Sequence, residues 1–283
     1  MNQTKKKNPL KRLLSMRGMG QVVTVTIGLI VLLVAFALIN PNFWSPTNRT
    51  NLLRQIAPIL IIGIAQSYVL ITGNIDLSIG SVVGMSTMVA ATLMSKGIMS
   101  PIPALLVTLL CCLLVGVLNG LLVAKFKLPP FIATLGTMTV ARGIAQLVNG
   151  NYNTDSIMKF YPEAAQTFKN VFYYGKTLGL YNGIWIAIIL WIVFNFLLSK
   201  TRTGRYIYAT GSNIDAARLS GVNVVSTTVI AYVVSAFCSF VVGIITCATV
   251  GQGTMDAGNS YEMYAVAASV IGGVSTLGGQ GIL

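Results

Sequence analysis

Long apolar runs alternate with short polar stretches along the whole chain. Eight such runs can be marked, at residues 22–39, 56–72, 78–94, 103–124, 129–149, 182–199, 225–250 and 259–278. Most of them approach the roughly 20 residues that a helix needs to cross a bilayer. The third and the eighth are the most interrupted, because both are rich in Gly and Ser. The pattern predicts an all-α polytopic membrane protein with about eight spans, since a β-barrel would show short alternating segments instead.

Composition strengthens this prediction. Of the 283 residues, 54% are hydrophobic and only 9% are charged, and the mean hydropathy is +0.77, whereas a soluble domain carries about 25% charged residues. The net charge of +13 comes from basic residues in the gaps between apolar runs, so the chain has no compact basic domain for binding nucleic acid. The four cysteines lie inside apolar runs and are expected to behave as small hydrophobic residues.

The positions of Lys and Arg predict the orientation. The basic segment 1–21 precedes an apolar run that is too long for a signal peptide and lacks a small-residue cleavage site, so it is expected to remain as a first span. With this segment in the cytoplasm, 12 of the 19 basic residues fall on the cytoplasmic side and 6 on the outer side, as the positive-inside rule expects. Residues 22–283 then form one permease-like domain with a cytoplasmic loop at 200–224 and an extracytoplasmic loop at 150–181.

The stretch ITGNIDLSIGSVVG, residues 71–84, places polar groups at the junction of the second and third spans. Ionisable groups at membrane depth are costly and are expected to face a cavity or a partner. Asn74, Asp76 and Ser78 therefore predict a broken helix whose irregular backbone borders a translocation path. A plain cytoplasmic turn with Asp76 as a helix N-cap is the alternative.

The stretch PPFIATLGTMTVARGIAQLVNG, residues 129–150, contains Thr137, Thr139, Arg142 and Gln146. The last three are spaced i, i+3 and i+7, which places them on one face of a helix. Such a polar stripe within an apolar span is expected to point toward the bundle interior or a water-filled path. The alternative is an Arg142 side chain that extends to the outer interface.

The largest polar interruption is TRTGRYIYATGSNIDAARLSGVNV, residues 201–224. Ser212 and Asp215 match the S-x-x-D pattern of a capped helix start, and Gly221 is a typical helix stop. The pattern predicts a cytoplasmic helix of about two turns with fixed ends. The chain has no phosphate-binding loop and no cluster of catalytic or metal-binding residues, so we expect no enzyme and an energy source in another chain.

Four stretches together, at 71–84, 128–150, 201–224 and 269–281, resemble the membrane permease subunit of bacterial ABC importers for monosaccharides of the ribose, xylose and galactose type. The resemblance implies a vitamin-B12-importer-type (type II) bundle in the bacterial inner membrane, a second permease copy, an extracytoplasmic sugar-binding protein, and an ABC ATPase subunit that binds the ATP. It implies no cofactor in this chain. The expected ATPase-coupling residues are Ser212, Asn213, Asp215, Ala216, Ala217, Arg218, Leu219, Ser220 and Gly221.

Two questions stay open at this level. Permeases of this kind continue for several dozen residues beyond the glycine-rich segment at 269–281, so we expect the C-terminal spans to be missing from this chain. The solute is also open: a permease of the same fold for nucleosides or other small polar solutes is an alternative, and a self-sufficient carrier or channel is a more distant one.

Overall fold

The computed structural model describes residues 19–283, and the predicted cytoplasmic N-terminus (1–21) lies outside them except for its last three residues. The long helices are α2 (Met19–Ile39), α3 (Pro46–Ile71), α4 (Ile79–Ser95), α5 (Pro101–Ala124), α6 (Pro130–Leu147), α8 (Asn182–Lys200), α11 (Val224–Val250) and α12 (Tyr261–Ile271). The shorter elements are α7 (Pro162–Lys169), the π-helix η1 (Asn170–Tyr174), α9 (Arg202–Ser212), α10 (Ile214–Leu219), and an antiparallel pair formed by β1 (Lys176–Thr177) and β2 (Leu180–Tyr181).

The helices fit a polytopic membrane protein. Within the described residues, α3, α5, α8 and α11 are long and apolar enough to cross a membrane, and shorter apolar helices lie at 23–39, 79–95 and 261–271. Seven of the predicted apolar runs form a helix over most of their length. The predicted run at 259–278 is helical only over Tyr261–Ile271, and turns follow it. Gly273, with φ +94°, adopts a left-handed conformation there that a continuing helix does not allow.

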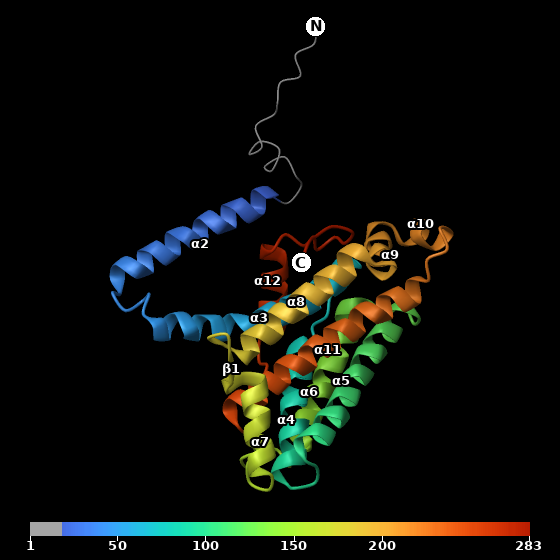
Figure 1. Cartoon of the computed structure of the whole chain (residues 1–283). Helices are drawn as coiled ribbons and strands as arrows, with labels where there is room; N and C mark the ends of the chain where they lie inside the picture. Colours follow the sequence, from blue (N-terminus) through green and yellow to red (C-terminus); the bar gives the residue numbers. More distant parts are fainter. Residues whose placement is uncertain (1–18) are drawn as a thin grey trace.

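The core lies around α3 and α11. In their most apolar windows 67% and 72% of the residues are buried, against 28% in both α5 and α8. The bundle packs closely where α5 crosses α11, because Gly116 lies against Ala236, and Gly120 against Val229. Helix α2 stands apart from this bundle (Figure 1).

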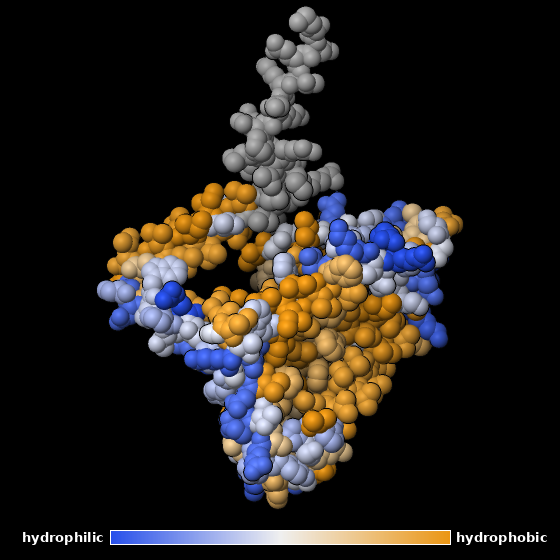
Figure 2. Space-filling model, viewed as in Figure 1, coloured by the Kyte–Doolittle hydropathy of each residue, from blue (hydrophilic) through white to orange (hydrophobic). Residues whose placement is uncertain are grey.

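Polar surface gathers at two ends of the molecule. Figure 2 shows a broad apolar surface over α5, α8 and α11, with hydrophilic residues over α9 and α10 at one end and along α7 at the other. The loops at 200–224 and 150–181 thus lie at opposite ends of the bundle (Figure 1), as their predicted opposite sides of the membrane require. Of the elements within these loops, α10 corresponds to the predicted short helix, whereas α7, η1, α9 and the small sheet were not predicted.

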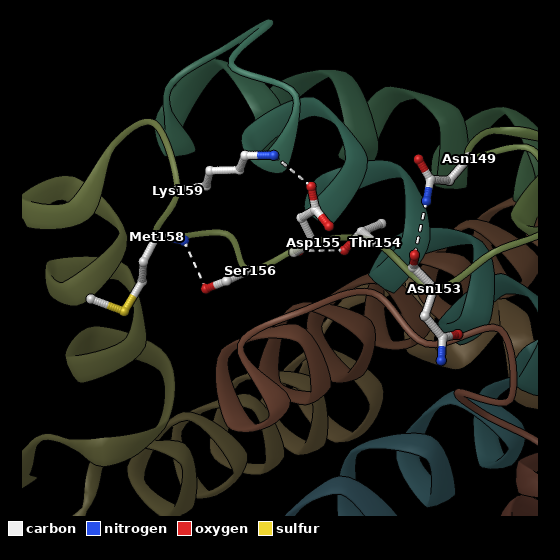
Figure 3. Close-up of polar contacts among 7 residues, drawn as sticks. All are labelled: Asn149, Asn153, Thr154, Asp155, Ser156, Met158 and Lys159. Atoms are coloured by element: carbon white, nitrogen blue, oxygen red, sulfur yellow. Dashed lines mark hydrogen bonds and ion pairs between the residues drawn. The ribbon is translucent and has the colours of Figure 1, made fainter.

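The loop that follows α6 is built from local polar contacts (Figure 3). Lys159 Nζ donates to Asp155 Oδ2 at 2.7 Å, and this bond lowers the pKa of the Asp155 carboxyl. The next contact joins two distant loops: Thr154 N donates to Gly253 O at 3.0 Å, and Gly253 N donates to Thr154 Oγ1 at 2.8 Å. The loop after α6 and the turn after α11 therefore hold each other in place.

Candidate coupling and transport site

The link between α3 and α4 carries a buried carboxylate. Asp76 is only 3% exposed. Its Oδ1 accepts hydrogen bonds from Ser78 N at 2.9 Å and Ser78 Oγ at 2.6 Å, and its Oδ2 accepts one from Ser235 Oγ of α11 at 2.7 Å. A buried carboxylate without such donors would be strongly unfavourable. The link is therefore tied to a helix far away in the sequence.

These bonds continue into two further helices. Asn119 of α5 donates from Nδ2 to Ser78 Oγ at 2.9 Å, and Thr137 of α6 donates from Oγ1 to Asn119 Oδ1 at 2.6 Å. We call these five residues (Asp76, Ser78, Asn119, Thr137 and Ser235) the Asp76 network. Each hydroxyl and amide in it has a partner, and fully satisfied buried networks rigidify a core. The network joins four parts of the bundle: the α3–α4 link, α5, α6 and α11.

The structure confirms the irregular backbone predicted for this link. Residues 72–78 are not helical, and Gly73 has φ +77°. The alternative of a plain turn is not observed, because Asp76 is buried and the N-cap position of α4 belongs to Ser78. Asn74 lies differently from Asp76: it donates to Thr72 Oγ1 and lines a cavity of about 670 Å³ that α10 also borders.

The three polar residues of the α6 stripe, Thr139, Arg142 and Gln146, do not share one environment. Arg142 Nη1 donates to Met255 O at 3.0 Å and Ala257 O at 2.9 Å, so it holds the turn between α11 and α12. Gly84 of α4 leaves space for it, since a Cβ there would lie 2.7 Å from Arg142 Nη1. Thr139 and Gln146 are exposed, so these two do not point into the interior of this bundle, and their place on a water-filled path stays a prediction.

The reason lies in the small residues of α6. Its buried residues are Ala133, Thr134, Ala141 and Ala145, which let the neighbouring helices approach. Arg142 stands at the edge of this buried face, and its long side chain reaches the turn at 255–257. Thr139 has a shorter side chain and bonds only to Leu135 O of its own helix. The outward extension of Arg142 that was the alternative is not observed either.

Helix α10 forms where a short capped helix was expected. Its N-cap is Asn213, whose Oδ1 accepts hydrogen bonds from Asp215 N at 3.0 Å and Ala216 N at 2.9 Å. Ser212 was expected to cap the helix; this is wrong, because Ser212 is the last residue of α9. Gly221 ends the segment as predicted, with φ +81° and its N–H bonded to Arg218 O.

The two sides of α10 differ. Ala217 is buried and packs with Val222 and Val224. In contrast, Leu219 is 90% and Ile214 47% exposed, and the side chains of Asp215 and Arg218 are exposed, with 3.9 Å between Arg218 Nη1 and Asp215 Oδ1. The helix is thus anchored on one side and presents apolar and charged side chains on the other.

Sequence reasoning missed Asn119 and Ser235 of the Asp76 network, and it missed helix α9. The signal for the first two was weak, since each is an uncharged polar residue within an apolar span and no motif surrounds it. For α9 a signal existed: Thr201 caps its start by accepting a hydrogen bond from Gly204 N, and Thr is a favoured N-cap residue.

Comparison with known proteins supplies the family. The family model described as "Branched-chain amino acid transport system / permease component" matches residues 48–282. The chain belongs to this permease family. It is 40% identical to the ribose import permease protein of Haemophilus influenzae over 258 residues, which cover 90% of this chain and 77% of that protein. It is 35% identical to the galactofuranose transporter permease protein of Escherichia coli over 281 residues, covering 96% and 79%.

The ribose import permease protein of Bacillus subtilis is also similar, at 35% identity over 256 residues that cover 90% of this chain and 77% of that protein. No solved structure matches the chain. The predicted resemblance to monosaccharide import permeases is confirmed, and membership of the permease family makes the chain a transport subunit and not an enzyme. The match at 48–282 includes the Asp76 network, Arg142 and α10.

Proposed function

We propose that this chain forms the membrane pathway of an ATP-driven ABC importer, and that its solute is a monosaccharide delivered by an extracytoplasmic binding protein. The named relatives support this choice, since two are ribose import permeases and one is a galactofuranose transporter permease. A permease of the same fold for nucleosides or other small polar solutes is the main competing proposal. A self-sufficient carrier or channel fits less well, because ABC permeases depend on partner subunits.

The same proposal gives α10 and its caps, from Ser212 to Gly221, the role of the coupling helix that docks into the partner ATPase. The observation that carries it is the exposed Leu219 on a short helix with both ends capped. A large apolar side chain that is 90% exposed at a polar end of the molecule suits a site of protein contact. The charged Asp215 and Arg218 beside it suit the rim of such a contact.

The remaining architecture is proposed with it. The α9–α10 end and the N-terminus face the cytoplasm of a bacterial cell, and the α7 end faces outward toward the binding protein. Two permease copies associate, each a type II bundle with about eight spans in this chain. Among the expected path residues, Asn74 borders a cavity, whereas Asp76, Ser78, Thr137 and Arg142 position the helices around the path. Thr139 and Gln146 lie on a surface open to lipid or to the second copy.

The coupling role can be tested by co-purification of the ATPase with the membrane-inserted chain. Arg218→Glu, Leu219→Asp and a Gly-Ser replacement of residues 213–220 should each reduce the recovered ATPase by about tenfold or more, as for central contact residues of an interface. Insertion and monodispersity in detergent should remain as in the wild type for Arg218→Glu and Leu219→Asp, because these two side chains are exposed.

Lys159→Glu is the matched control. Lys159 is likewise an exposed base beside an acid one turn away, but it lies in the loop at 150–181. This variant should keep the ATPase. If all three α10 variants retained wild-type amounts of ATPase, the coupling role of α10 would be wrong.

A further inference from the structure

A second polar feature lies away from the Asp76 network and α10. A cavity of about 390 Å³ opens between the first half of α3, the C-terminal end of α11 and the start of α12, beside Tyr173 of η1 in the loop at 150–181. Its size falls within the roughly 300–1,000 Å³ of small-molecule sites. The polar and aromatic residues that line it include Arg54, Gln55, Tyr173, Thr249, Tyr261 and Tyr264.

Arg54 is the unusual member of this pocket. Its guanidinium carbon lies 3.3 Å from the ring centroid of Tyr181 and 4.9 Å from that of Tyr173. Its Nε is buried and has no hydrogen-bond partner, and no carboxylate among the described residues lies within ion-pair distance of it. A buried donor without an acceptor is costly. The aromatic rings hold the guanidinium at the wall of the cavity, where its terminal nitrogens can donate to a ligand.

The other lining groups are neutral and can donate or accept. Gln55 is exposed and offers an amide with both functions. The Thr249 hydroxyl already donates to Ile245 O, so its oxygen remains as an acceptor. The rings of Tyr261 and Tyr264 lie 6.1 Å apart, and Tyr264 is 51% exposed, which leaves a flat apolar surface beside a hydroxyl. The ligand that matches has several hydroxyl groups or other hydrogen-bonding groups, and one apolar face.

The pocket also leads along the bundle. A second cavity of about 290 Å³ shares Ile59 with it and follows α3 and α12 past Gly63 and Ser269 to Gly272. The α12 residues Tyr261, Tyr264 and Ala268 line the two cavities together with Gly272, which follows the helix, and the spacing of three and four places the helical residues on one face. The polar pocket is thus the outer end of a groove between α3 and α12.

We propose that the pocket around Arg54, Gln55 and Tyr264 binds a neutral monosaccharide at the outer end of this groove. The inference rests on the proposed function and assigns the solute of that function a place in the chain. The aromatic rings stack on the apolar face of the sugar ring, and Arg54, Gln55 and Thr249 bond its hydroxyl groups.

The test uses the full transporter, assembled with its ATPase and binding protein in phosphatidylethanolamine–phosphatidylglycerol liposomes. Uptake of radiolabelled D-ribose, D-xylose and D-galactose is measured together with ATP hydrolysis. For the sugar that the wild type transports, Gln55→Ala, Arg54→Gln and Tyr264→Leu should each lower the sugar imported per ATP hydrolysed by about fivefold, the effect of about one lost hydrogen bond or stacking contact. ATPase association should not change.

Gln166→Ala is the matched control, because Gln166 is also an exposed glutamine but lies on α7 outside this pocket. It should transport like the wild type. Tyr264→Phe removes only the hydroxyl and guards against loss through misfolding: it should transport between the wild type and Tyr264→Leu.

The two proposals fail in different ways. If the wild-type transporter imported none of the three sugars, the proposed function and the pocket would fall together. The wild type and the three pocket variants could instead import the same sugar with the same amount imported per ATP hydrolysed. That result would overturn sugar binding at the pocket and leave the proposed function intact. Loss of co-purified phospholipid from Arg54→Gln with unchanged sugar uptake would identify a lipid headgroup site and overturn the inference.

Discussion

The α3–α4 link and α10 are both short polar segments between helices, and they border the same cavity of about 670 Å³, yet they are held in opposite ways. Asp76 is buried and reaches Ser235, 159 residues away. The caps of α10 come from residues within three positions of their partners, and most of its side chains are exposed. In the first segment polarity organises the bundle, and in the second it is free for contact with another molecule.

The largest effect is expected from Asp76→Ala. It removes the acceptor of three buried hydrogen bonds, at a cost of roughly 1–3 kcal/mol for each donor left unpaired. The thermal unfolding midpoint in detergent should fall more than for any substitution in α10. Asp215→Ala is the control, since Asp215 is an exposed acid in α10. Equal thermal unfolding midpoints for Asp76→Ala and Asp215→Ala would show that the α3–α4 link and α10 do not differ in their contribution to stability.

A smaller effect is expected from Asn119→Ala. This side chain bridges Ser78 and Thr137, and its loss should cost roughly 1–3 kcal/mol. Thr137→Val should cost less, because it leaves only Asn119 Oδ1 without its donor, whereas Asn119→Ala takes a hydrogen bond from both Ser78 Oγ and Thr137 Oγ1. Measured unfolding free energies of the single and double variants should be less than additive, as for residues in one network. Full additivity would show that the two act independently.

The smallest effect is expected from Asn213→Ala. Loss of this cap should cost about 1 kcal/mol, confined to α10. Hydrogen exchange of the amides of Asp215 and Ala216 should become faster, with the global unfolding midpoint unchanged. Ser212→Ala should leave both amides protected, because Ser212 does not cap the helix. Faster exchange in Ser212→Ala and not in Asn213→Ala would contradict the observed cap.

The same contrast explains how much the sequence predicts. Features set by neighbours along the chain were predictable: most apolar helices, the break after Ile71, and a short helix stopped by Gly221. Even there the cap moved by one residue, because Ser212 and Asn213 are both good capping residues and the preceding helix α9, which takes up Ser212, was not foreseen.

Features set by distant partners were not predictable. Nothing near Asp76 indicates Asn119 or Ser235, and nothing in α6 indicates the carbonyl groups at 255 and 257 that turn Arg142 away from Thr139 and Gln146. Periodicity places a residue on a face of a helix, but it does not say which helix or turn lies opposite that face. The pocket around Arg54 belongs to this class as well, because its walls come from α3, η1, α11 and α12.

The bond between Asp76 and Ser235 also has a consequence for biosynthesis. A ribosome that adds roughly 5–20 residues per second needs about 8–30 s to make the residues that separate them. During that interval Ser78 is the only member of the Asp76 network able to donate to the carboxylate, and Asn119 can join only after residue 119 has left the ribosome. The α3–α4 link must therefore stay hydrated or shielded until α11 arrives, which makes insertion of α11 the step that completes the Asp76 network.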